Sequence, residues 1–78
     1  MKIELYTRDD CFWCFKAKEL LNHNHLDYRE IKIGQDLTRE EFKEMFPEQK
    51  TVPYIFVDSK PIGGYDNLHE WMTFNYMD

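Results

Sequence analysis

Cys11 and Cys14 are the side chains of this sequence whose types and spacing point most directly to chemistry. Two cysteines separated by two residues can exchange electrons with a disulfide, or they can bind a metal ion. On a helix, Cys14 would lie one turn after Cys11, close enough for its sulfur to attack a mixed disulfide formed at Cys11. The spacing by itself leaves redox chemistry and metal binding both open.

The predicted position of the pair favours redox chemistry. Residues 2–6 alternate polar and apolar side chains and predict a strand, whereas residues 12–24 contain no helix breaker and predict a helix. Cys11 therefore lies at the helix start, where unpaired N–H groups carry partial positive charge and stabilise a thiolate. We predict that Cys11 is the exposed attacking cysteine, with a lowered thiol pKa, and that Cys14 is the more buried resolving cysteine.

A zinc site is the main alternative. Cys11, Cys14, His23 and His25 could be listed as four ligands. However, a single residue separates the two histidines, whereas paired zinc histidines usually have about three to five residues between them. The histidines also fall at the end of the predicted helix, where a cationic side chain is favoured. We therefore expect no metal.

Strands are predicted on both sides of this helix and again near the end of the sequence. Residues 27–33 alternate like residues 2–6, and a strand, helix and strand of this spacing imply a parallel pair with a right-handed crossover. Residues 54–57 predict a third strand. A tight turn at residues 58–60 leads into a short fourth strand that ends at Gly63-Gly64, so the last two strands are antiparallel.

Two further helices are predicted. Thr38 and Glu41 fit a capping box, and Pro47 stops the helix that follows. Its predicted buried face consists of Phe42, Met45 and Phe46. Asp66 is expected to cap a last helix. The apolar face of that helix consists of Leu68, Trp71 and Met72. The element order is β-α-β-α-β-β-α, which defines an α/β fold.

The composition is that of a small folded protein. The 78 residues are 42% hydrophobic, and a formal net charge of −5 with scattered basic residues argues against nucleic-acid binding. The N-terminus lacks the apolar core of a signal peptide, and no apolar stretch approaches the roughly 20 residues that span a bilayer. We expect a cytoplasmic protein with no membrane partner, where close cysteines serve redox or metal chemistry rather than structure.

Three segments of the sequence resemble the glutaredoxin family: residues 6–14 with the cysteine pair, Thr51-Val52-Pro53, and residues 62–66. The resemblance implies one glutaredoxin-like domain over residues 1–78, with a thioredoxin-like fold of a four-stranded mixed sheet flanked by three helices. It also implies a monomeric enzyme that uses glutathione, and no metal, to reduce disulfide-containing or glutathionylated proteins, with ribonucleotide reductase as a candidate substrate.

The resemblance further implies a glutathione site. In the family the proline that matches Pro53 is cis, which leaves the backbone of Val52 facing the cysteines. The start of the last helix would meet the γ-glutamyl end of glutathione, and Arg8 with one of Gln49 or Lys50 would meet the glycyl carboxylate. The implied glutathione-binding residues are Arg8, Phe12, Trp13, Gln49, Lys50, Thr51, Val52, Pro53, Gly64, Tyr65 and Asp66.

The sequence departs from the family between the cysteines, where Phe12 and Trp13 replace the common Pro and Tyr. We expect Phe12 to be exposed. Two interpretations of the rings stay open: an apolar platform for a protein partner, or packing of Trp13 on the domain. Two other functions also stay open: a glutaredoxin-like redoxin reduced by a flavoprotein thioredoxin reductase, and a non-catalytic module that holds zinc or an iron–sulfur cluster.

Overall fold

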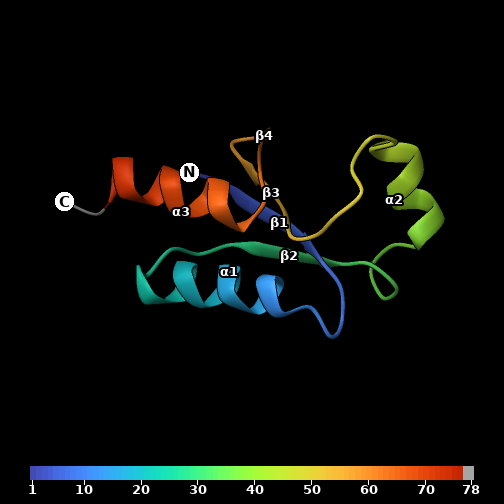
Figure 1. Cartoon of the computed structure of the whole chain (residues 1–78), viewed down its shortest axis with the longest axis horizontal. Coiled ribbons are helices and arrows are strands. Elements are labelled where there is room, and N and C mark those ends of the chain that lie inside the picture. The colour runs from blue at the N-terminus through green and yellow to red at the C-terminus, as the bar shows by residue number, and fades with distance from the viewer. Residues whose placement is uncertain (77–78) are drawn as a thin grey trace.

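The computed structural model describes residues 1–76. The elements follow the predicted order. They are β1 (Ile3–Thr7), α1 (Phe12–His23), β2 (Arg29–Lys32), α2 (Arg39–Met45), β3 (Tyr54–Val57), β4 (Lys60–Gly63) and α3 (Tyr65–Asn75). Figure 1 shows α1 and α3 near one end of the molecule and α2 at the other. The predicted α/β class is confirmed.

The four strands form one mixed sheet in the order β2-β1-β3-β4. β1 runs parallel to β2 and antiparallel to β3, and β3 runs antiparallel to β4. In the β1–β3 pair, Tyr6 lies opposite Tyr54. The end of β1 and the start of β3 therefore meet at the same edge of the sheet, so the segment after Thr7 and the segment before Tyr54 emerge side by side.

One face of the sheet carries the apolar core. The alternation of β1 buries Ile3, Leu5 and Thr7 on this face. α1 and α3 cover the face with their apolar stripes. The core consists of Ile3, Leu5, Ala17, Leu21, Ile55, Leu68 and Met72. Both helices begin near the sheet edge where β1 ends, so the core fixes the two helix N-termini relative to each other (Figure 1).

The opposite face carries an aromatic cluster of five rings: Tyr6, Phe42, Phe46, Tyr54 and Phe56. Neighbouring ring centroids are 4.9 to 6.4 Å apart. Two rings come from the α2 segment and three from the central strands, so aromatic packing holds α2 against the sheet.

The capping box at the start of α2 is confirmed. The N–H of Glu41 donates to Oγ1 of Thr38 at 3.0 Å, and the N–H of Thr38 donates to Oε1 of Glu41 at 2.7 Å. The predicted burial of Met45 is wrong, because its side chain is 52% exposed. The rings of Phe42 and of the C-cap residue Phe46 pack against Tyr6 of the sheet, and Met45 is rotated about 100° from Phe46 around the helix axis.

The predicted N-cap at Asp66 is also wrong. The N-cap of α3 is Gly64, and Asp66 lies in the first turn, where its charge still favours the helix. Oδ1 of Asn67 accepts the N–H of Gly64 at 3.1 Å, so the side-chain half of the cap comes from inside the helix. Gly63 has a φ of +117°, and this left-handed turn starts the helix earlier than the sequence pattern indicated.

Candidate active site

Cys11 and Cys14 are joined in a disulfide at the start of α1, with their Cα atoms 5.2 Å apart. Cys11 is the N-cap residue, and its Sγ accepts the N–H of Cys14 at 3.2 Å. Cys14 is only 2% exposed, whereas Cys11 is partly exposed. The predicted order of exposure is therefore confirmed, and Cys11 is the sulfur that a partner can reach.

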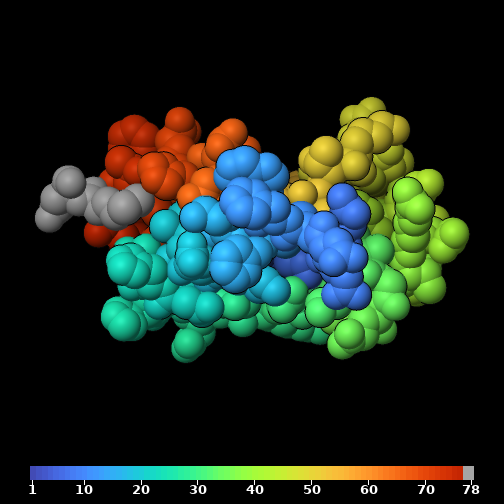
Figure 2. Space-filling model, turned by 60° about the horizontal axis from the view of Figure 1, so that its bottom comes forward, coloured from blue at the N-terminus to red at the C-terminus, as the bar shows by residue number. Residues whose placement is uncertain are grey.

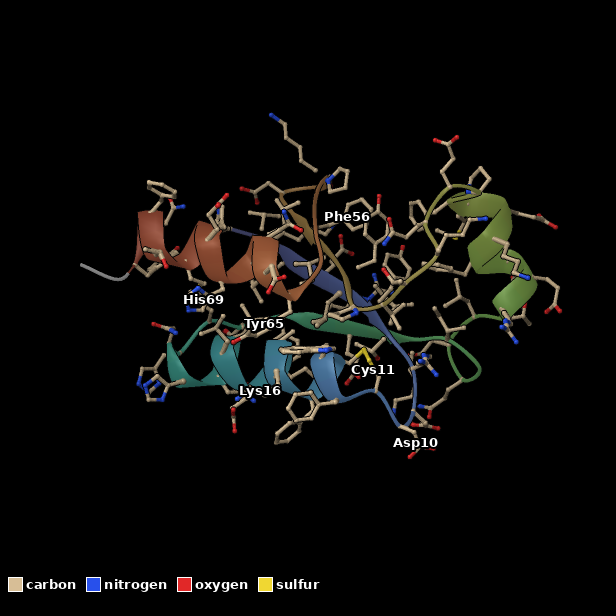
Figure 3. The ribbon with its side chains drawn as sticks, in the orientation of Figure 1. Asp10, Cys11, Lys16, Phe56, Tyr65 and His69 are labelled. Atoms are coloured by element: carbon tan, nitrogen blue, oxygen red, sulfur yellow. A yellow bond between two sulfur atoms is a disulfide. The ribbon has the colours of Figure 1, made fainter. Side chains whose placement is uncertain are left out.

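A short loop after β1 delivers Cys11 to this position. Asp10, the last residue of the loop, has a φ of +55°, a conformation that aspartate tolerates better than most residues. The N–H of Phe15 then donates to the carbonyl oxygen of Cys11 at 3.1 Å and closes the first helical turn. Figure 3 shows Cys11 at the helix start, with Asp10 in the loop before it.

The segment that precedes β3 forms the second wall of the site. The carbonyl oxygen of Val52 lies 3.7 Å from Sγ of Cys11, and the Val52–Pro53 peptide bond is cis, as the family resemblance implied. A Cβ atom placed on Gly64 would lie 3.6 Å from the carbonyl oxygen of Pro53. The cysteine pair, the Val52–Pro53 segment and the start of α3 are therefore contiguous in space.

Aromatic side chains surround the outer side of the disulfide. Phe12 is 63% exposed, which confirms its predicted exposure, and Trp13 is 52% exposed. The Trp13 ring centroid lies 5.1 Å from that of Phe12 and 5.2 Å from that of Tyr65. Trp13 thus packs against Tyr65 of α3 while about half of the residue stays exposed. Figure 3 shows Tyr65 at the start of α3, on the side that faces α1.

The remaining predicted glutathione contacts lie around this centre. Arg8, Lys50, Thr51 and Asp66 are exposed. The side-chain amide of Gln49 donates to the carbonyl oxygen of Thr51 at 2.9 Å. Within residues 1–76 no hydrogen bond links these five side chains to the cysteines. Their contacts with glutathione stay predictions.

A hollow of about 370 Å³ adjoins the disulfide, and its lining includes residues that the sequence interpretation missed as site residues. Phe15, Lys18 and Lys32 line it together with both cysteines, Phe12 and residues 8–10. A sequence signal for Phe15 was present, because Phe15 lies four residues after Cys11 and so shares a helical side with it. Lys32 had no such signal, since it comes from the end of β2.

A partly buried hydrogen-bond network adjoins the hollow through Lys18. Thr7 is fully buried, and its hydroxyl donates to Oε2 of Glu30 at 2.6 Å. Nζ of Lys18 donates to the same oxygen at 3.0 Å. Burial raises the pKa of Glu30, but the hydrogen bonds from Thr7 and Lys18 and the charges of Lys18 and Lys32 outweigh burial. The net result is a lowered pKa for this carboxyl group.

Comparison with known proteins identifies the family. The glutaredoxin family model matches residues 3–62. The chain belongs to the glutaredoxin family. Glutaredoxin 3 of Escherichia coli is 34% identical over 67 residues, which cover 86% of this chain and 81% of the relative. Glutaredoxin 1 of Rickettsia prowazekii is 43% identical over 70 residues, which cover 85% of this chain and 72% of the relative.

Solved structures agree with this assignment. The glutaredoxin from Brucella melitensis superposes with a TM-score of 0.76 at 31% identity, covering 100% of this chain and 85% of that one. The fold is therefore thioredoxin-like, and the predicted fold class is confirmed. As a glutaredoxin, the chain is a thiol–disulfide oxidoreductase, and Cys11–Cys14 is its redox-active disulfide.

Residues 1–76 contain neither a metal-binding cluster nor a membrane-spanning helix. Among residues 1–76, no group of three or more His, Cys, Asp or Glu side chains is arranged to hold a metal ion. His23 is the last residue of α1 and His25 lies just beyond it, at the far end of the helix from the cysteines. No helix within residues 1–76 is long and apolar enough to cross a membrane.

Proposed function

We propose that this glutaredoxin is glutathione-dependent and that it reduces protein disulfides and glutathione mixed disulfides. The position of Cys11 carries the proposal, because its sulfur lies 3.7 Å from the carbonyl oxygen of Val52 and adjoins the start of α3. An extended tripeptide can pair with the backbone of Val52 as an added strand does, while its own sulfur reaches Cys11.

Charged groups on both sides of Cys11 complement the two ends of glutathione. The N-terminus of α3 and Asp66 suit the carboxylate and ammonium of the γ-glutamyl end. Arg8 and Lys50 suit the glycyl carboxylate. Lys50 is the better candidate of the two neighbours, because the amide of Gln49 already donates to Thr51. A buckwheat glutaredoxin with this fold has been solved as a glutathione complex, with a TM-score of 0.77, although 24% identity limits that likeness to the fold.

Cys11 is the attacking residue in this proposal. In the reduced protein, the N–H of Cys14 and the open first turn of α1 would stabilise negative charge on Sγ of Cys11. We therefore expect the Cys11 thiol to have a lower pKa than a free cysteine. A thiol titration tests this expectation, and an ordinary cysteine pKa at Cys11 would contradict it.

With a glutathionylated protein, the Cys11 thiolate attacks the glutathione sulfur. A Cys11–glutathione disulfide forms, and the protein thiolate leaves and takes a proton. The thiolate of a second glutathione then attacks the bound glutathione sulfur, which releases oxidised glutathione and restores the Cys11 thiolate. With a protein disulfide, Cys11 forms the mixed disulfide, Cys14 attacks Sγ of Cys11, and the substrate leaves as a dithiol. Two glutathiones then reduce the Cys11–Cys14 bond.

The setting of the reaction is proposed on the family resemblance. We place one glutaredoxin-like domain over residues 1–78, acting as a monomer in the cytoplasm. Its substrates are disulfide-containing or glutathionylated proteins, with ribonucleotide reductase as the candidate to test first.

The deciding experiment is a glutathione-coupled reduction assay on the wild type and on single cysteine variants. We expect Cys11→Ser to abolish turnover, and Cys14→Ser to keep removing glutathione from a mixed disulfide while losing reduction of protein disulfides. Full activity of Cys11→Ser would overturn the mechanism. If a flavoprotein thioredoxin reductase regenerates the oxidised protein and glutathione does not, the glutathione dependence is wrong and the chain is the redoxin type instead.

A further inference from the structure

We propose that Phe15, together with Phe12, forms a subsite for an apolar side chain of the substrate protein. The side chain belongs to a residue beside the cysteine whose disulfide is reduced. This inference rests on the proposed function and names its protein substrates. They are extended segments with an aliphatic or aromatic residue one or two positions from the reactive cysteine.

The exposure of these rings next to the disulfide is the first observation. Phe12 is 63% exposed and Phe15 is 57% exposed, and Trp13 between them is 52% exposed. Single exposed apolar residues are common on protein surfaces, but a contiguous group marks a contact surface. Here Phe12 and Phe15 line the hollow together with both cysteines of the redox-active disulfide. A partner whose sulfur reaches Cys11 must therefore lie beside these rings.

The helix holds the position of Phe15 relative to the reactive sulfur. The N–H of Phe15 donates to the carbonyl oxygen of Cys11 at 3.1 Å, within the first turn of α1. Figure 2 shows the light-blue start of α1 protruding between the orange start of α3 and the yellow segment before β3. The surface is therefore preformed and continuous with the site that the disulfide partner must occupy.

The charges around the hollow favour an apolar occupant over an anionic one. Nζ of Lys18 is paired with Glu30 at 3.0 Å, and Nζ of Lys32 is paired with Asp9 at 3.2 Å. Arg8 has no ion-pair partner among residues 1–76, and the proposed function assigns it to the glycyl carboxylate of glutathione. Both lysines of the hollow are thus paired, and the carboxylate of Asp10 in the lining also disfavours an anion. The exposed rings of Phe12 and Phe15 are then the groups of the lining that suit an apolar side chain.

Glutathione does not account for Phe15, which lies outside the set of implied glutathione-binding residues. It has two charged ends, two amides and a thiol, and no apolar side chain. Its proposed groove runs along Val52 and the start of α3. Phe15 is therefore left for the protein half of the exchange, and the exposed ring of Phe12 adjoins it in the lining of the hollow. An extended chain advances about 3.3–3.6 Å per residue, so a side chain one or two positions from the substrate cysteine can reach them.

Glutathionylated peptides test the subsite. Two peptides carry glutathione on a single cysteine and differ only in the two flanking residues, which are both leucine or both serine. We expect the wild type to use the leucine peptide with a kcat/KM about 5- to 10-fold higher, carried mainly by KM, because the contact forms before the chemistry. Phe15→Ser should bring the ratio of the two kcat/KM values to about 1, and Phe15→Leu should retain most of it.

Phe74→Ser is the matched control, because Phe74 is an 83% exposed phenylalanine on α3 outside the site. Its ratio of kcat/KM for the leucine peptide to kcat/KM for the serine peptide should equal that of the wild type. Equal use of the two peptides by the wild type, or an unchanged ratio in Phe15→Ser, overturns the subsite while glutathione turnover stands. Single-turnover reactions of the pre-reduced protein with the glutathionylated peptides measure the same preference with no free glutathione in the solution. Failure of glutathione to regenerate the enzyme is therefore a separate result, which bears on the proposed function alone.

Discussion

The carboxylate of Glu30, on β2, links the sheet to the first helix through two hydrogen bonds. It accepts the hydroxyl of Thr7, a fully buried residue at the end of β1, and the ammonium of Lys18, one turn after Cys14. A carboxylate in this position would lose free energy through burial if it were unpaired. Its two donors reverse that effect and make the ionised form the preferred one in the folded protein.

This network predicts a pH dependence of stability. Because the folded-state pKa of Glu30 is lowered, its stabilising contribution is fully present above the unfolded-state pKa and is lost as pH falls through the folded-state pKa. Thr7→Val should lower the free energy of unfolding at pH 7 by about 1–2 kcal/mol. It should also make the free energy of unfolding decrease less between neutral and acid pH than it does in the wild type. Urea denaturation between about pH 7 and pH 3 measures both effects, because that interval spans the ordinary carboxyl titration range.

Glu44→Gln serves as the control for this experiment. Glu44 is exposed on α2, and its side chain forms no hydrogen bond or ion pair within residues 1–76. This variant should keep the stability and the acid-dependent fall of the wild type. If Thr7→Val had the same pH profile as the wild type, the hydrogen bond to Glu30 would not be the cause.

At the scale of elements, the start of α3 depends on one turn. Gly63 has a φ of +117°, and a side chain there would collide with Asn67, whose amide oxygen completes the cap of the helix. The next residue, Gly64, adjoins Pro53. The conformation of this turn therefore sets the distance between α3 and the segment that faces the disulfide.

Gly63→Ala should destabilise the fold by about 2–4 kcal/mol and raise the KM for glutathione, because left-handed strain adds to the collision with Asn67. Gly34→Ala is the matched control. Gly34 has a φ of +94° but open space around it, so its alanine variant suffers the backbone strain alone. Thermal unfolding and glutathione kinetics of both variants separate the two effects. Equal losses in the two variants would show that the contact with Asn67 contributes nothing.

The sequence predicted the helices and strands better than it predicted side-chain burial, helix caps and the lining of the site. Alternation, helix breakers and the Thr38–Glu41 box are local signals, and each element they indicated is present. The burial of Met45 was mispredicted because it depends on how narrowly α2 contacts the sheet, which no local pattern specifies. The cap at Gly64 was missed because Asn67 supplies it from inside the helix. At the site, the cysteines were evident, whereas Lys32 reaches the hollow only through the pairing of β2 with β1.

At the scale of the whole molecule, both faces of the sheet carry apolar packing. A chain of this size has a stability of only about 4–12 kcal/mol, so neither face is dispensable. The aliphatic core joins α1 and α3 to one face, and the aromatic cluster joins α2 to the other. The cluster includes Tyr6 and Tyr54, which lie opposite each other in the strands that lead to the active site. The aromatic face thus supports the edge of the sheet from which the disulfide loop and the Val52–Pro53 segment emerge.

Phe42→Ala tests this division. Phe42 is 6% exposed and its ring lies 5.5 Å from Tyr6 and 5.4 Å from Phe46, so its removal leaves a cavity in the cluster. We expect a loss of about 3–5 kcal/mol, a large part of the total stability. Phe74→Ala, at an 83% exposed position of α3, should change the free energy of unfolding by less than about 0.5 kcal/mol. Urea midpoints of the two variants measure the difference. A cost below about 1 kcal/mol for Phe42→Ala would mean that the aromatic face adds little to stability, leaving the fold dependent on the aliphatic core alone.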